Sequence, residues 1–175
     1  MPIEVREAVL PLLETIAELS RRIGEVDHRI EELVEERYPR AKCLQQVPGV
    51  GPLISLTFVL TIDDPKRFTR SRQVGAYLGL TPRQHQSGER NPQMHITKTG
   101  DSSLRTLLIQ GAHYILGWRG PDSDLRKWGL ARMERGGGNA KKCAVVAVAR
   151  KLAVLLHHLW MSGAVYRPLM EVPAV

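Results

Sequence analysis

The sequence predicts a mainly helical protein, in which an N-terminal coiled-coil helix precedes a compact helical domain. Apolar residues recur at alternating steps of three and four near the N-terminus, and glycine- or proline-bearing turns separate further amphipathic segments. The alternation typical of strands is weak throughout. With 175 residues, of which 43% are hydrophobic, the chain can bury the core of one ordinary domain with an appendage. We therefore expect a helix over residues 1–38 and a domain over residues 39–175.

The first helix carries a heptad pattern. Its apolar positions are Leu12, Ile16, Leu19, Ile23, Val26, Ile30 and Leu33. A narrow stripe of this kind, sustained over about three heptads, is what a coiled coil requires, so we expect two copies of the chain to pair through residues 10–37. The alternative is a single amphipathic helix packed on its own domain, whose stripe is usually wider. Pro39 should end the helix, because proline disfavours helical geometry at the preceding residue.

Turn and capping residues divide the rest of the chain into further helices. These are expected from Pro39 to about Val47, from Pro52 to about Ile62, over 71–79, from Asp101 to about Leu116, over 123–135 and over 140–162. Pro52 suits a first helical position, where its missing N–H costs nothing. Asp101 and Asn139 are expected to cap the helices that follow them, and Gly163 to close the last one. Residues 80–100 form a long polar loop or ribbon, and a loop of that length is more often functional than idle.

Charge is divided unevenly along the chain. Residues 1–38 contain 5 Lys/Arg and 10 Asp/Glu, a net charge of −5, whereas residues 39–175 contain 20 Lys/Arg and 8 Asp/Glu, a net of +12. A basic body favours a polyanionic partner, and we expect nucleic acid rather than membrane, because no basic amphipathic helix with a clean apolar face stands out. No membrane span is expected either, since Arg150-Lys151 and His157-His158 interrupt the longest apolar stretch.

The two cysteines, Cys43 and Cys143, lie far apart and form no CxxC pair. The start of the chain lacks the basic-then-apolar order of a signal peptide. We therefore expect a cytoplasmic protein with two reduced, buried thiols. No metal site is expected, because the histidines have no Cys or carboxylate companions at ligand spacing and residues 39–175 hold no acidic set suited to two-metal phosphoryl chemistry.

Val-Pro-Gly-Val-Gly-Pro at 47–52 is typical of the hairpin in a helix-hairpin-helix. Gly49 and Gly51 allow the backbone to turn with positive φ and to approach a phosphate closely. Together with Val50, they would present backbone N–H groups and the dipole of the next helix to DNA phosphates without reading bases. The alternative is a tight corner between two helices that binds no ligand.

A second basic turn, formed by Thr97, Lys98, Thr99 and Gly100, leads into the helix that Asp101 caps. Lys98 would add a point charge and the threonine hydroxyls would add donors to a phosphate site. Arg105, one helical turn further on, would lie on the same side. The alternative is a capped helix start that is merely solvated. The two turns together predict two phosphate-binding points.

Ser87 lies between these turns in a basic loop. A serine attacks a phosphodiester only when its hydroxyl is deprotonated or well aligned and the developing charge is stabilised. Arg83, Arg90 and Lys98 could stabilise that charge, and His85 could accept the proton. The alternative reading, from spacing alone, is an ordinary loop serine.

Several motifs in one order resemble the C-terminal domain of the insertion-sequence one-ten (Piv/MooV, DEDD-type) transposase family. They are the run 47–52, Tyr-Leu-Gly-Leu-Thr-Pro-Arg-Gln at 77–84, Ser-Gly at 87–88, Ile-Thr-Lys-Thr-Gly-Asp at 96–101, Leu-Arg at 104–105 and Ala-Val-Ala-Arg-Lys-Leu at 147–152. The resemblance covers about residues 40–165. It implies a DNA-binding recombinase that takes part in transposition, in which Ser87 is the nucleophile of a composite active site. The heptad helix corresponds to the family's joining coiled coil.

The resemblance also implies partners that this chain does not contain. Family members carry an N-terminal RuvC-like domain whose DEDD carboxylates bind metal, so magnesium is expected only with that domain, which these residues lack. Some members are guided by a noncoding RNA made by the element. In this sequence Glu89 follows Gly88 where the family commonly has a second glycine, and an acid beside the nucleophile repels phosphate. We therefore expect the isolated chain to bind DNA without cleaving it. The alternative is a non-catalytic DNA-binding module or an inactive transposase remnant.

Overall fold

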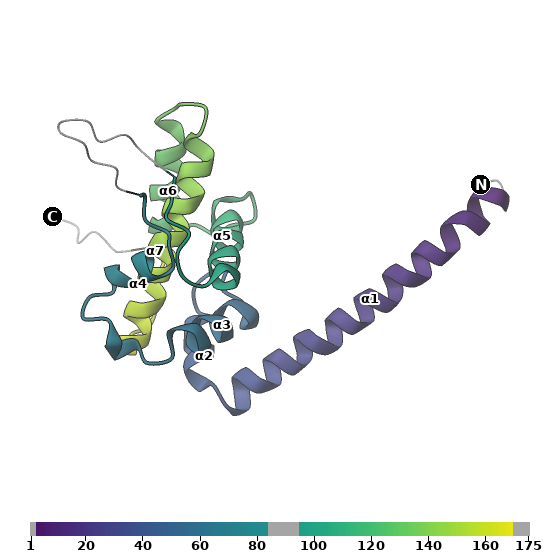
Figure 1. Ribbon diagram of the computed structural model, residues 1–175, viewed down its shortest axis with the longest axis horizontal. Helices are drawn as coiled ribbons and strands as arrows, with labels where there is room; N and C mark the ends of the chain where they lie inside the picture. Colours follow the sequence, from purple (N-terminus) through teal and green to yellow (C-terminus); the bar gives the residue numbers. More distant parts are fainter. Residues whose placement is uncertain (1–2, 84–94, 170–175) are drawn as a thin grey trace.

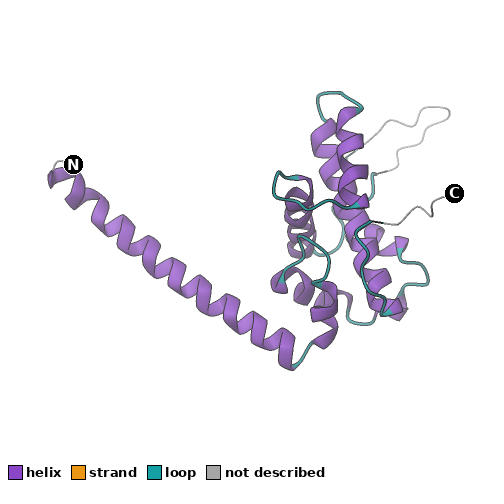
Figure 2. Ribbon diagram, turned by 180° about the vertical axis from the view of Figure 1, so that it is seen from behind, coloured by secondary structure: helices purple, strands orange, loops and turns teal. Residues whose placement is uncertain are grey.

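The computed structural model describes residues 3–83 and 95–169. Its elements are α1 (Ile3–Glu36), α2 (Pro39–Leu44), α3 (Pro52–Ile62), the 3-10 turn η1 (Pro65–Arg67), α4 (Arg72–Tyr77), α5 (Ser102–Leu116), α6 (Asp124–Glu134) and α7 (Ala140–Ser162). Figure 1 shows a long arm attached to a compact helical body, and Figure 2 shows the same arrangement from behind. The described residues contain no strand, and one antiparallel bridge joins Pro82 to Ile96. The predicted fold class is confirmed.

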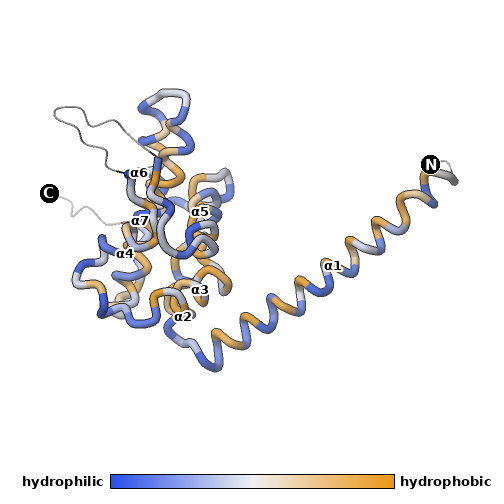
Figure 3. Tube along the Cα trace, viewed as in Figure 1, coloured by the Kyte–Doolittle hydropathy of each residue, from blue (hydrophilic) through white to orange (hydrophobic). Residues whose placement is uncertain are grey.

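The arm is helix α1, whose C-terminal end joins the body and whose N-terminal end projects away from it (Figure 1). Val34 is buried and Ile30 and Leu33 are partly buried, and these last turns pack on α2 and α3. The rest of the predicted stripe is open to solvent, with side chains that are 54–63% exposed; these are Leu12, Ile16, Leu19, Ile23 and Val26. Apolar segments recur along the arm in Figure 3. The helix and its stripe are therefore present, and pairing with a second copy stays a prediction.

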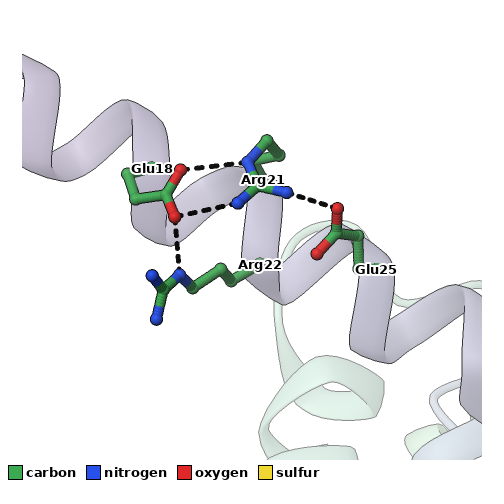
Figure 4. A network of polar contacts seen from close by, with 4 residues as sticks. All are labelled: Glu18, Arg21, Arg22 and Glu25. Carbon is green, nitrogen blue, oxygen red and sulfur yellow. Dashed lines mark hydrogen bonds and ion pairs between the residues drawn. The ribbon is translucent and has the colours of Figure 1, made fainter.

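Charged side chains along α1 pair with one another. Glu18 accepts hydrogen bonds from Arg21 and Arg22, and Arg21 also pairs with Glu25 (Figure 4). The bonds from Arg21 and Arg22 lower the pKa of the Glu18 carboxyl, and the bond to Glu18 raises the pKa of the Arg21 guanidinium. Charged pairs three or four residues apart lie on one face of a helix, and they stabilise a helix that projects into solvent.

Helix α7 lies at the centre of the body, where α4, α5 and α6 pack against it. Its buried residues are Ala144, Val145, Val148, Ala149, Leu152, Ala153, Leu156, His157, Leu159 and Trp160. By length and composition α7 could cross a membrane, but its apolar window is 56% buried inside the fold. That burial is the ordinary behaviour of a core helix, and it explains why residues 140–162 are so apolar.

One polar side chain is buried among these core residues. His157 is 1% exposed, with Nδ1 3.0 Å from the Ser71 hydroxyl and Nε2 2.8 Å from the Pro65 carbonyl oxygen. Because a carbonyl can only accept, Nε2 carries a proton, and in the neutral imidazole Nδ1 then accepts from the Ser71 hydroxyl. The imidazole thereby joins α7 to η1 and to the start of α4.

The helix ends agree with the turn chemistry, with two corrections. The Asp101 carboxylate accepts from the Leu104 amide at 2.6 Å, and Gly163 closes α7 with φ +64°, as predicted. Asn139 occupies the capping position of α7, but its side chain makes no capping hydrogen bond. Helix α2 ends at Leu44 rather than near Val47, because the chain already turns toward the hairpin.

A third correction concerns the thiols, which are free but exposed rather than buried. Cys43 follows the exposed Lys42 on α2, whose buried residues are Ala41 and Leu44. Cys143 similarly continues the exposed first turn of α7, before burial starts at Ala144. The apolar character of a cysteine does not decide which helical face it occupies.

Candidate nucleic-acid interface

The predicted hairpin connects α2 to α3 and packs on α5. Gly49 has φ +84°, and a Cβ at this position would lie 3.0 Å from the Gly111 carbonyl oxygen. A Cβ on Gly111 would in turn lie 2.9 Å from the carbonyl oxygen of Gly49. The turn and α5 therefore meet backbone to backbone, and this contact, together with the positive φ, requires glycine at position 49.

The three predicted hairpin residues have different roles. The side chain of Val50 is buried, and its amide donates to the Val47 carbonyl at 3.0 Å, so Val50 anchors the turn and offers no free N–H. Gly51 is exposed, with an extended backbone and no atom within 4 Å of the position that a Cβ would occupy. The first hydrogen bond of α3 runs from Ser55 to Gly51, which leaves the amides of Leu53 and Ile54 without an intrahelical partner. Those amides are the donors that this turn can offer.

Carboxylates from α1 face this same helix start. A cavity of about 240 Å³ is lined by residues of α1, α2 and α3, namely His28, Glu31, Glu32, Val34, Glu35, Lys42, Gln45 and Pro52. Glu35 pairs with Lys42 at 2.8 Å, and that hydrogen bond, followed by the charge of Lys42, lowers the pKa of the Glu35 carboxyl. The acidic end of the arm therefore disfavours a phosphate at the start of α3 while α1 holds this position.

The second predicted turn belongs to a short ribbon. The Thr97 amide donates to the carbonyl oxygen of Thr81 at 2.9 Å, and the Lys98 amide donates to the carbonyl oxygen of Gly79 at 3.1 Å. A Cβ on Gly79 would lie 2.4 Å from both the amide nitrogen and the carbonyl oxygen of Thr99. A Cβ on Gly100 would lie 2.1 Å from the Tyr77 carbonyl oxygen. Two glycines thus allow this turn to lie directly on the end of α4.

Arg105 fixes this turn in place. One of its guanidinium nitrogens, Nη1, donates to the carbonyl oxygens of Leu78 at 3.1 Å and of Thr99 at 2.9 Å. Arg105 therefore braces α5 against the ribbon, whereas the sequence suggested a cation that faces DNA. Lys98 is exposed and adopts φ +57°, an uncommon conformation for a residue with a side chain. The hydroxyls of Thr97 and Thr99 lie 3.1 Å apart.

The base of the ribbon brings together Arg83 and His95, the described residues that flank the segment containing the predicted nucleophile. The Arg83 amide donates to the His95 carbonyl at 2.9 Å, and the Arg83 side chain is exposed. Ser87, His85 and Arg90 lie outside the described residues. Arg83 and His95, the described residues on either side of this segment, therefore lie next to each other beside the second turn.

Positively charged side chains on the described part of the body have few anionic neighbours. Apart from the interactions of Asp124, the ion pairs within the described part of the chain all involve carboxylates of α1, namely Glu18, Glu25, Glu32 and Glu35. Several cations of the body instead lie over aromatic rings. The Lys151 Nζ lies 4.0 Å from the centre of the Trp128 ring, and the guanidinium carbon of Arg67 lies 5.1 Å from the centre of the Tyr77 ring. Such contacts leave the charge uncompensated and available to a polyanion.

A further basic region, which was not predicted from the sequence, lies at the tip formed by α6 and α7. Its cavity of about 320 Å³ is lined by Arg132, Arg135, Gly136, Gly137, Gly138, Asn139, Ala140 and Cys143. Lys141 and Lys142 follow it on exposed positions. The sequence does carry a signal, because basic residues lie on both sides of the three glycines, whereas the glycines by themselves indicate only the end of a helix.

The described residues do not supply a metal centre, since residues 3–83 and 95–169 contain no group of three or more His, Cys, Asp or Glu side chains that could hold an ion. The magnesium that the resemblance associates with a RuvC-like domain has no ligand set within these ranges.

Comparison with known proteins identifies the class of this domain. Residues 41–127 match the family model described as Transposase IS116/IS110/IS902 family. That range contains the hairpin, the ribbon and the second turn. The resemblance inferred from the motifs is thus confirmed, and the chain carries a transposase domain of the IS116/IS110/IS902 family.

Individual relatives agree with this assignment. The chain is 40% identical over 125 residues to the transposase for insertion sequence element IS1111A of Coxiella burnetii, covering 71% of this chain and 34% of that protein. It is 32% identical over 169 residues to a probable family 20 transposase of Pseudomonas aeruginosa, covering 96% of this chain and 49% of that protein. A pilin gene-inverting protein of Moraxella bovis is 32% identical over 146 residues, 81% of this chain and 44% of its own length. The chain spans between a third and a half of these relatives.

Proposed function

We propose that this chain is the DNA-binding part of a transposase or site-specific recombinase. The observation that carries the proposal is the combination of a transposase-family domain with a basic body whose cations have few anionic partners. Transposases and a gene-inverting protein are among its relatives. Because both reactions rearrange DNA, a DNA partner accounts for the charge better than solubility does.

Phosphates would be bound at two points, the second turn and the hairpin. At the second turn, Lys98 supplies charge, Thr97 and Thr99 supply hydroxyl donors, and Arg83 lies at the base of the same ribbon. At the hairpin, the amides after Gly51 are the donors, and this point becomes favourable to a phosphate only when the carboxylates of α1 no longer face the start of α3. Contacts of this kind position the duplex without reading sequence. Arg90 remains a predicted contact from the sequence, and Gly100 and Arg105 contribute by holding the turn in shape.

Ser87 is the proposed nucleophile. Its Oγ would attack the scissile phosphorus, the hydroxyl proton would pass to a base, and the bond from phosphorus to the leaving oxygen would break. The products are a phosphoserine link and a free DNA hydroxyl. Exposed cations beside the ribbon would stabilise the charge that develops on the phosphate oxygens. Glu89 opposes this step in the isolated chain, so binding without cleavage is the second candidate function.

The arm would pair two copies of the chain through its open stripe. An exposed row of Leu, Ile and Val at heptad spacing suits a two-stranded coiled coil, and Arg22 and Asp27 flank the stripe at positions that can pair between parallel helices. A guide-type RNA remains a prediction from the resemblance, and an RNA ligand in the binding assay tests it.

Binding to duplex DNA by Lys98→Gln and Lys66→Gln variants tests the proposal. Both lysines are exposed, and each variant removes one charge. We expect Lys98→Gln to weaken binding and Lys66→Gln to leave it close to that of the parent chain. Equal losses would indicate that only net charge matters and that the second turn is not a phosphate site.

A further inference from the structure

Trp118 is the most exposed large hydrophobic residue that the structure describes. Its side chain, in the turn between α5 and α6, is 84% exposed. The guanidinium carbon of Arg119 lies 4.5 Å from the centre of its ring. The other tryptophans differ, because Trp160 is buried in the core and Trp128 is partly buried beneath Lys151. Residue 118 thus holds a large flat ring in solvent with a cation on one face.

The turn that carries this ring is fixed by several contacts. The Gly117 amide donates to the carbonyl oxygen of Tyr114 at 3.1 Å, and the Gly120 amide donates to the carbonyl oxygen of Gly117 at 3.2 Å. Nη1 of Arg126 donates to the carbonyl oxygens of both Ile115 and Gly117. A Cβ on Gly120 would lie 2.2 Å from the Ile115 carbonyl oxygen, so the backbone approaches itself closely here. The ring is therefore presented by an ordered turn, which lowers the entropy lost when a ligand binds it.

The turn also lies close to a proposed phosphate-binding point. Tyr114, one helical turn before Trp118, is exposed, and its Cδ1 lies 3.1 Å from the position of a Cβ on Gly49. The hairpin thus contacts the same end of α5 that carries the aromatic turn. A nucleic acid held at the hairpin would pass close to Trp118.

We infer that Trp118 and Arg119 form a stacking site for an unpaired nucleic-acid base. One ring face is covered by the Arg119 guanidinium, and the high exposure leaves the other face free for a base. Aromatic rings bind unpaired bases by stacking, and a neighbouring arginine adds cation–π and phosphate contacts. A tryptophan that anchors a protein partner usually lies within a ring of further contact residues, whereas its neighbours in this turn are Gly117, Arg119 and Gly120. The inference rests on the proposed function, and it specifies single-stranded segments as the ligand of this turn.

Binding of three ligands separates this inference from the proposal that it rests on. The probes are oligodeoxythymidine, oligouridine and a DNA duplex, and the variants are Trp118→Ala and Trp118→Phe, with Val165→Ala as a control at another highly exposed position. We expect Trp118→Ala to weaken binding to a single strand by between about fivefold and a hundredfold. Trp118→Phe should retain most of that affinity, because it retains a ring. Duplex binding should change little in either variant.

Tryptophan fluorescence gives a second measurement. Oligodeoxythymidine or oligouridine should quench the emission of the parent chain, and the quenching should be lost in Trp118→Phe. The oligonucleotide that quenches identifies whether the base comes from DNA or RNA. Unchanged single-strand binding by Trp118→Ala would overturn the stacking site while leaving the proposed function intact. A parent chain that binds neither duplex nor single strand would overturn both.

Discussion

Replacing Gly100 with alanine should destabilise the protein more than its backbone conformation alone can explain. Gly100 has φ +74°, and the added Cβ would lie 2.1 Å from the Tyr77 carbonyl oxygen. A left-handed conformation costs a residue with a Cβ about 1–2 kcal/mol. The clashing atom belongs to the backbone, so it cannot rotate away as a flexible side chain would.

Relief of this clash must separate the second turn from the end of α4. That movement breaks the hydrogen bond from Lys98 to Gly79 and at least one of the two made by Arg105. A neutral hydrogen bond contributes a net of about 0.5–1.5 kcal/mol, and one from a charged group about 1.5–3 kcal/mol. Together with the conformational cost, we expect Gly100→Ala to lower the free energy of unfolding by about 3–6 kcal/mol.

Gly136→Ala is the matched control, because Gly136 has a similar φ of +82° with no atom within 4 Å of its added Cβ. It should cost only the conformational part, about 1–2 kcal/mol. Urea unfolding, followed by the circular dichroism signal of the helices, gives both values. The comparison requires that the free energy of unfolding falls with urea concentration at the same slope in both variants. Equal losses in the two variants would refute the close contact between the second turn and α4.

Three further predictions concern the arm and the core. Ile23→Asp places a charge in the open stripe and should convert a dimer to a monomer in sedimentation velocity, and a dimer that persists would contradict the coiled coil. His157→Ala should lower the free energy of unfolding by about 2–5 kcal/mol, because it leaves a cavity and two unpaired polar groups; a loss below about 1 kcal/mol would show that these bonds matter little. Lys42 lowers the pKa of the Glu35 carboxyl, so their ion pair should stabilise the junction of α1 and α2 at pH values above the usual carboxyl pKa. This stabilisation should be lost as the pH falls through the lowered pKa of Glu35. Hydrogen exchange at this junction should show that pH dependence in the parent chain and not in Lys42→Gln.

Local chemistry was sufficient to predict most of the fold. Heptad spacing predicted α1, the Asp101 carboxylate predicted the start of α5, and Gly163 predicted the end of α7, because each signal acts within a few residues of its effect. The burial expected for the cysteines was wrong because residue type alone does not fix which helical face is buried.

The candidate site was harder to predict, because its geometry depends on contacts between distant segments. Arg105 has the charge of a DNA contact, yet it braces the fold through Leu78, which lies 27 residues away in the chain. Val50 lies in the turn that the sequence predicts to bind phosphate, but the packing of the turn buries it. The carboxylates near Pro52 come from α1, and only the angle between the arm and the body brings them there. Spacing identifies which residues could bind phosphate, and tertiary contacts decide which of them are free to do so.

The central claim is that the basic body binds DNA through several phosphates. It is tested most directly by measuring the affinity of the purified chain for duplex DNA across a salt series. Counterion release predicts that log K falls linearly with log salt, with a slope of about −0.9 for each phosphate neutralised. We expect a slope that corresponds to several phosphates, and a slope shallower by about 0.9 in Lys98→Gln. A chain that binds no duplex at low salt, or a slope near zero, would contradict the account.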